Sequence, residues 1–187
     1  GSGAPDNGAP AVICEGATQA IADGPQLQVL IAHPPETGFP SITGLALAAA
    51  YEAELHSQGR PHFSWAEKMG LTAHLVDANK AARDGELVAL VNAAAVIPPV
   101  FEPPLRQGKR VVDGGMADRA PMPDPDSGET LILLTRRYDN LPEADGRVFL
   151  SPSQETPADK IDFTHPGKLR DSRALGENDA KRLLGLT

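Results

Sequence analysis

Apolar and polar positions follow one another in blocks along the chain, and the lengths of the apolar blocks predict its strands. Continuous apolar runs of strand length stand at 27–32 (LQVLIA) and 130–135 (TLILLT), and a shorter run stands at 147–150. Such runs are typical of strands that are buried on both faces. Pro34 and Pro35 are expected to end the first strand, because proline has no N–H to donate to a sheet.

Helical periodicity occurs between these runs. The pattern predicts helices over 12–22, 41–58, 84–95 and 172–184, with a further turn of helix from Ser64 to Gly70. The segment 41–58 is rich in strong helix formers, and the stop signals Gly59 and Pro61 follow it. Asp84 is expected to cap the third helix, and Gly185 to end the last one. Strands that alternate with amphipathic helices indicate an α/β domain with a mostly parallel sheet.

The composition fits one globular, loop-rich domain. The 187 residues include 18 prolines and 18 glycines but only 4% aromatic residues, so Ala, Val, Leu and Ile are expected to form most of the core. The net charge of −8, without any basic run, argues against a nucleic-acid partner. Since no apolar run approaches the roughly 18 residues of a membrane span, we also expect no transmembrane segment.

The first residues are interpreted as a lead-in to the domain. Gly1-Ser2-Gly3 has no initiator methionine, and residues 1–11 have no periodicity. Residues 1–24 are therefore expected to form a flexible lead-in with a short helix, and residues 25–187 to form the domain. The single cysteine, Cys14, excludes an internal disulfide framework, and the sequence leaves the compartment open between cytoplasmic and secreted.

The stretch 108–122 (GKRVVDGGMADRAPM) has the most distinctive chemistry. Two valines followed by Asp113, Gly114 and Gly115 predict a strand that ends on a carboxylate. The two glycines allow backbone angles that other residues avoid, and they place no side-chain bulk behind the carboxylate. Taken alone, Asp-Gly between extended segments is more often only a hairpin turn, so the surrounding sequence has to decide.

That surrounding sequence resembles the patatin-like phospholipases. AAAVIPPVFEP, VVDGG and ADRAP, in this order over 93–121, resemble the third and fourth conserved blocks of the family. The segment VFLSPSQETPADKIDFTHPGKLRDSRALGENDAKRLL at 148–184 is similar to the C-terminal segment of bacterial members. These serine acylhydrolases use a Ser-Asp dyad. The resemblance therefore implies a three-layer sandwich related to the α/β-hydrolases, hydrolysis of phospholipid or neutral lipid esters, and no cofactor.

The resemblance also implies roles for individual residues. Asp113 would be the general base that accepts the proton of a serine hydroxyl as that hydroxyl attacks an ester carbonyl. Gly114 and Gly115 would support the motif by leaving the carboxylate accessible. Ile97 and Phe101 would be candidates for the wall of an acyl pocket, and plain core packing is the simpler interpretation of both.

The chain departs from the family pattern in two places. Arg119 stands where the family usually has asparagine. No serine lies in a G-x-S-x-G elbow, and no glycine-rich loop offers oxyanion donors. We therefore expect the C-terminal part of an acylhydrolase whose serine lies upstream, inactive by itself.

Two alternatives stay open. One is a non-catalytic module with the patatin scaffold that binds lipid or a protein partner. The other is one of two polypeptides that together complete the domain. A sheet without its upstream strands would have an open edge and an exposed apolar face, which predicts poor solubility or tight association.

Other polar clusters give weaker signals. The five histidines, His33, His56, His62, His74 and His165, have irregular spacing without a pair at i and i+4. This spacing favours dispersed histidines over a metal site. The aspartates at 118, 124 and 126 lack the glycine and the closing glutamate of an EF-hand. The sequence therefore predicts neither a metal nor an organic cofactor.

Overall fold

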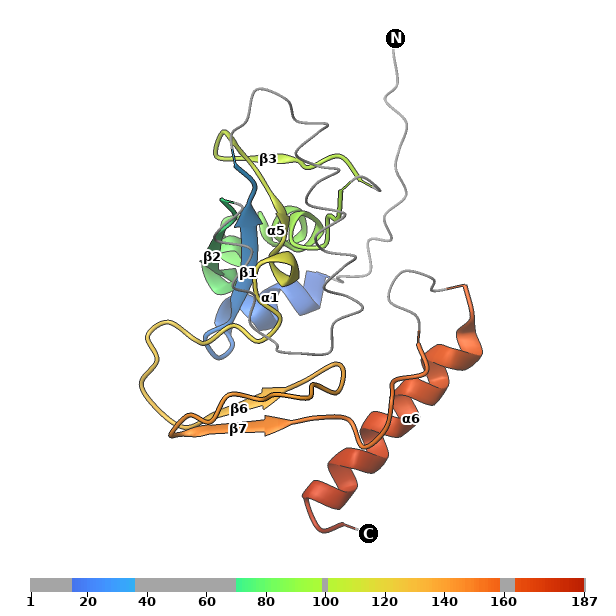
Figure 1. Ribbon diagram of the computed structural model, residues 1–187. Coiled ribbons are helices and arrows are strands. Elements are labelled where there is room, and N and C mark those ends of the chain that lie inside the picture. Colours follow the sequence, from blue (N-terminus) through green and yellow to red (C-terminus); the bar gives the residue numbers. More distant parts are fainter. Residues whose placement is uncertain (1–14, 36–69, 99–100, 159–163, 187) are drawn as a thin grey trace. The chain divides into compact units, whose positions relative to one another are not determined.

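The computed structural model describes residues 15–35, 70–98, 101–158 and 164–186, which fall into two units divided after residue 117 (Figure 1). The described elements of the first unit are α1 (Glu15–Asp23), β1 (Gln28–His33), β2 (Thr72–Asp77), α4 (Ala78–Arg83), α5 (Leu87–Ala93), β3 (Leu105–Arg106), β4 (Lys109–Arg110), β5 (Val112–Asp113) and the 3₁₀ turn η1 (Gly114–Met116). Those of the second unit are β6 (Thr130–Leu133), β7 (Arg147–Leu150) and α6 (Pro166–Leu183). The helix expected at 41–58 lies outside the described residues, as does 64–69 of the turn expected before Gly70.

A three-stranded sheet in the order β2-β1-β5 organises the first unit. Its middle strand is antiparallel to both neighbours, and Ile31 pairs with His74 on β2 and with Asp113 on β5. Because directly paired residues share a face of an antiparallel sheet, these three side chains project from the same face. The sequence pattern favours a mostly parallel sheet, so the direction of both pairings here differs from that expectation.

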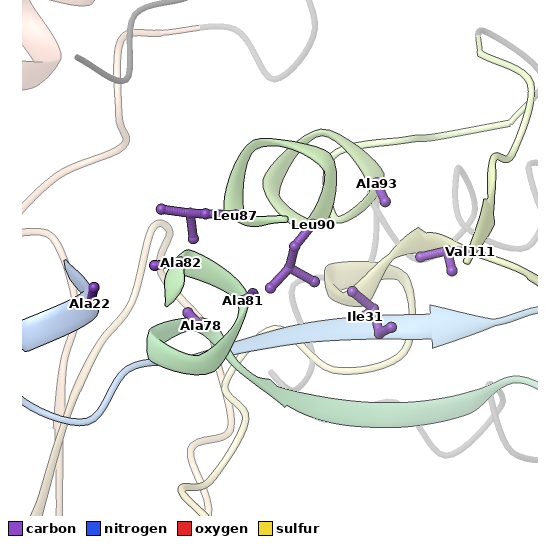
Figure 2. Packing of buried hydrophobic residues seen from close by; sticks show 9 residues of the cluster. All are labelled: Ala22, Ile31, Ala78, Ala81, Ala82, Leu87, Leu90, Ala93 and Val111. Carbon is purple, nitrogen blue, oxygen red and sulfur yellow. The ribbon is translucent and has the colours of Figure 1, made fainter. Parts of the chain in front are cut away.

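Helices and sheet pack in the first unit around small and aliphatic side chains. The buried cluster consists of Ala22, Ile31, Ala78, Ala81, Ala82, Leu87, Leu90, Ala93 and Val111 (Figure 2). Its residues come from α1, β1, α4, α5 and the segment before β5, and Leu90 is completely buried. Alanines predominate where α4 contributes, which lets backbones approach closely. The expected core of Ala, Val, Leu and Ile is confirmed for this cluster.

Asn79 is the buried polar side chain in the described part of the first unit. Its Nδ2 donates to the backbone oxygens of Ile21 at 2.7 Å, Gly24 at 3.3 Å and Pro25 at 3.0 Å. Its Oδ1 accepts a 2.7 Å hydrogen bond from the N–H of Leu27. One amide therefore satisfies the turn between α1 and β1, and it fixes this turn to α4.

The second unit contains a parallel pair of strands, β6 and β7, in register from Thr130 with Arg147 to Leu133 with Leu150. Behind one face lies a buried cluster of Ala120, Ile132 and Leu134, with Met122, Tyr138, Leu141 and Phe149 packed against it. On the opposite face, Leu131, Leu133 and Val148 are 55%, 71% and 54% exposed. Helices and strands are thus mixed in the described chain, as expected of an α/β protein.

Most of the described elements coincide with predicted ones. β1, β6 and β7 overlap the three predicted strand runs, and α1 overlaps the helix expected over 12–22 and ends one residue beyond it. α6 begins at Pro166, six residues before the predicted start, since proline is favourable in a first helical turn. Gly185 follows the end of α6 with a φ of +64°, which confirms the predicted stop. No described helix has both the length and the hydropathy needed to span a membrane.

The segment from 70 to 95 differs most from its prediction. The helix predicted over 84–95 is the shorter α5, and its N-cap is Glu86. Asp84 instead ends α4, a helix that the periodicity does not reveal. Asp77, at the end of the unpredicted strand β2, caps α4 by accepting a 2.8 Å hydrogen bond from the N–H of Lys80.

Candidate functional site

Asp113 ends β5, so the prediction of a strand that stops on a carboxylate is confirmed. On one side its backbone pairs with Ile31 of β1. On the other side its N–H donates to the carbonyl oxygen of Val96 at 2.8 Å. The backbone that carries the carboxylate is therefore held from both sides, by the middle strand of the sheet and by the segment that follows α5.

The Asp113 side chain is half-buried and turns back onto its own chain. Its Oδ1 accepts a 2.7 Å hydrogen bond from the N–H of Gly115 and thereby caps η1. Within the described residues, this is the hydrogen bond that the carboxylate receives, and Oδ2 has none. Burial raises the pKa of Asp113 above its usual value, and the Gly115 N–H opposes that rise. A carboxyl with a raised pKa is a stronger proton acceptor once it is ionised, which suits a general base.

Neither glycine of the motif has a positive φ, so backbone conformation does not require glycine at these positions. The lack of room for a Cβ does. A Cβ on Gly114 would lie 2.3 Å from the carbonyl oxygen of Leu30 and 2.7 Å from its Cγ. A Cβ on Gly115 would lie 3.1 Å from Oδ1 of Asp113. The expectation that these glycines supply unusual backbone angles is therefore wrong. Gly114 lets η1 lie against β1, and Gly115 leaves room for the carboxylate.

The two acyl-pocket candidates lie on the segment that holds Asp113. Ile97 directly follows Val96, whose carbonyl binds Asp113, and it is half-buried. The N–H of Phe101 donates to the carbonyl oxygen of Ile97 at 3.2 Å, and Phe101 is 60% exposed. Core packing therefore does not account for Phe101. The structure brings this segment beside the Asp113 strand through one backbone hydrogen bond.

Two aspartates of the loop between η1 and β6, Asp118 and Asp126, interact with other parts of the protein. Oδ1 of Asp118 accepts a 2.9 Å hydrogen bond from the N–H of Ala120, which closes a local turn. Asp126 forms an ion pair with Arg147 of β7. Within the described part of the chain, no group of three or more His, Cys, Asp or Glu residues is arranged to hold a metal ion. Asp118 and Asp126 therefore have structural roles in this loop.

The structure brings together two histidines that the sequence keeps 41 residues apart. The ring centroids of His33 on β1 and His74 on β2 are 4.9 Å apart. Sequence spacing does not reveal this pair, since it arises from the register of two strands of which only β1 is predicted. Only a prediction of β2 and of its antiparallel pairing with β1 could have revealed this histidine pair from the sequence.

Comparisons with protein-family models, with curated proteins and with solved structures return no match to this chain. The resemblance to patatin-like proteins therefore rests on the motifs in the sequence.

Proposed function

We propose that this chain supplies the general base of a patatin-like lipid acylhydrolase. The observation that supports the proposal is the setting of Asp113, a half-buried carboxylate at a strand end with its backbone fixed by Ile31 and Val96. One carboxylate oxygen is occupied by the N–H of Gly115, while Oδ2 receives no hydrogen bond from the described residues. Oδ2 is therefore the oxygen that would accept the proton of a serine hydroxyl.

The proposed reaction needs a nucleophile outside the described residues, on a segment upstream of the matched motifs. Its serine hydroxyl would donate to Oδ2 of Asp113 and transfer its proton to that oxygen as it attacks the ester carbonyl. The alcohol leaves with that proton, and the acyl group stays on the serine. A water molecule that gives its proton to the same carboxylate then attacks the acyl carbon, and the serine oxygen takes that proton back as its bond to the acyl group breaks and the fatty acid is released. The three-layer patatin-like architecture belongs to this proposal, with the upstream segment as part of the domain.

The substrate class in this proposal is a phospholipid or neutral lipid ester. The side chain of Phe101 offers an exposed apolar surface on the segment bonded to the Asp113 strand, and Ile97 lies next to that bond. An acyl chain bound against these residues would place its ester near the strand end. The burial of the carboxylate would strengthen its interaction with the serine, because charges act more strongly where water is excluded.

The decisive experiment uses a protein that includes the upstream segment with the serine. Asp113→Asn should lower hydrolysis of a phospholipid or nitrophenyl ester by about 100-fold to 10,000-fold, the usual range for loss of a general base. Asp145→Asn, which changes an exposed carboxylate of the second unit, is the matched control and should retain activity. Wild-type turnover in the Asp113 variant would refute the assigned role.

Fluorophosphonate labelling of the 187-residue chain tests where the nucleophile lies. Intact mass and peptide mapping should show no label, because no serine of this chain has the elbow pattern. A stoichiometric label on one of its serines would contradict an upstream nucleophile and would identify the partner of Asp113.

A cavity in the second unit favours a second candidate function, a non-catalytic module that binds lipid. The cavity has a volume of about 320 Å³ beside α6, and its mainly apolar lining includes Leu133, Leu150, Leu175 and Leu183. Gly176 also lines it and has space for a larger side chain. Gly176→Leu should therefore abolish binding of a fluorescent fatty acid, whereas Gly167→Leu on the same helix, away from the cavity, should not. Equal binding by both variants would contradict this function.

A further inference from the structure

His33 and His74 form a cross-strand pair on the antiparallel ladder of β1 and β2. Ile31 pairs with His74 and His33 pairs with Thr72, so the two histidines are diagonal neighbours on one face of the sheet. Their ring centroids are 4.9 Å apart, and the ring planes are inclined by 59°. Each strand is six residues long and paired throughout, so the separation of the two rings is set by a continuous ladder.

The hydrogen bond of His33 determines which of its ring nitrogens can bind a ligand. Nδ1 lies 2.7 Å from the carbonyl oxygen of Arg110. Since a carbonyl oxygen only accepts, Nδ1 must carry a proton, and in the neutral imidazole Nε2 then has the free lone pair. Histidines that coordinate metal ions commonly donate their other ring N–H to a backbone carbonyl in this way. The His33 ring is therefore fixed by the same kind of hydrogen bond that holds metal-bound histidines.

We propose that His33 and His74 bind a divalent transition-metal ion of the Zn²⁺ class, with water molecules in its remaining coordination positions. Imidazole nitrogens suit Zn²⁺, Ni²⁺ and Cu²⁺, whereas Mg²⁺ selects oxygen ligands. His74 is exposed and His33 is half-buried, so the ion can arrive from solvent while the sheet stays intact. Two protein ligands make this an open site, which binds more weakly than a structural zinc centre with four.

Calorimetric titration of the whole chain with Zn²⁺ tests the proposal, with Mg²⁺ as the control ion. His33→Gln and His74→Gln should each weaken Zn²⁺ binding by about tenfold or more, since each leaves a single imidazole. His165→Gln, at the exposed start of α6, should bind as the wild type does. Cys14→Ser belongs in the series because a thiolate also binds Zn²⁺. Equal affinity in the wild type and both strand variants would overturn the site, as would a loss confined to Cys14→Ser.

A spectroscopic measurement on the wild type covers the case in which the strand variants fail to fold. With ¹⁵N-labelled histidine, Zn²⁺ should shift the ring nitrogen signals of His33 and His74, while Mg²⁺ leaves them unchanged. Zn²⁺ shifts confined to other histidines would refute the site. The proposal uses neither Asp113 nor a serine, so its outcome is independent of the hydrolase proposal.

Discussion

Gly114 lies so close to Leu30 that a Cβ at Gly114 would stand 2.3 Å from the Leu30 carbonyl oxygen and 2.6 Å from the carbonyl carbon. Both nearest atoms belong to the backbone of the central strand, which cannot move aside without breaking its pairing. Gly114→Ala is therefore expected to destabilise the protein by about 3 kcal/mol, the upper part of the usual range for overpacking. Urea unfolding measures this loss.

The control for Gly114→Ala is the same substitution at Gly16. Gly16 lies in α1 of the same unit, and a Cβ there would meet nothing within 4 Å. Because alanine favours helix more than glycine does, Gly16→Ala should leave stability unchanged or raise it by up to about 1 kcal/mol. Similar unfolding free energies for the two variants would contradict the close packing of η1 against β1.

Asp113 predicts a pH dependence of stability. Because burial raises its pKa, the folded state holds the proton more tightly than the unfolded chain. Its contribution to stability should therefore fall as pH rises from the pKa of an unfolded aspartate, about 3.9, through the higher pKa of the folded state. The side chain of Asp113→Asn cannot ionise, so the stability of this variant should not fall over this pH range. At pH values above the folded-state pKa the variant should therefore be more stable relative to the wild type than it is at low pH.

The Asp113 prediction is checked by urea midpoints at a series of pH values. Asp145→Asn removes an exposed carboxylate and should keep the wild-type profile. A difference between Asp113→Asn and the wild type that grows as pH is lowered would have the wrong sign and would argue against a buried, protonation-favouring site.

The four hydrogen bonds of the Asn79 side chain predict a large loss of stability when its amide is removed. Asn79→Ala would leave the N–H of Leu27 and three turn carbonyls without their partner. The loss of buried hydrogen bonds should lower the unfolding free energy by about 2 kcal/mol or more. Asn92→Ala on α5, where the side chain is exposed, should stay within about 0.5 kcal/mol of the wild type. Equal effects at both positions would be inconsistent with the turn being held by Asn79.

The exposed face of β6 and β7 predicts self-association. Leu131 and Leu133 project from the same face and are 55% and 71% exposed, beside Val148 on the paired strand. Replacing both leucines by lysine should reduce association in sedimentation velocity, because charge opposes burial of that face. The buried neighbour Ile132 is unchanged, so stability should be little affected. A wild-type chain that stays monomeric at all concentrations would contradict this prediction.

Local sequence signals were sufficient where an element is specified by its own residues. The apolar runs at β1, β6 and β7 are recognisable as strands by their length and hydrophobicity. The expected burial on both faces is wrong for β6, where Leu131 and Leu133 are 55% and 71% exposed. The end of α6 is recognisable because Gly185 takes a backbone conformation that other residues avoid. Asp113 at a strand end was predictable for a similar reason, since β-branched residues precede it and glycines follow.

β2 and α4 were missed because their signals are weak over short lengths. β2 (TAHLVD) alternates imperfectly and keeps four of its residues exposed, while α4 has only six residues. The pairing direction of β1 was missed for another reason. An apolar run predicts a strand, but the path of the chain between strands decides whether their pairing is parallel or antiparallel.

Residue pattern and composition alone predict the apolar core composition, the positions of β1, β6, β7 and most of α6, and the carboxylate of Asp113 at a strand end. These depend on propensities and burial, which act over a few neighbouring residues. The need for glycine at position 114 and the contact between His33 and His74 arise only in the folded chain, because strand pairing brings Leu30 against Gly114 and His74 beside His33. Contacts between distant segments depend on register and topology, and a one-residue slip would have replaced every one of them.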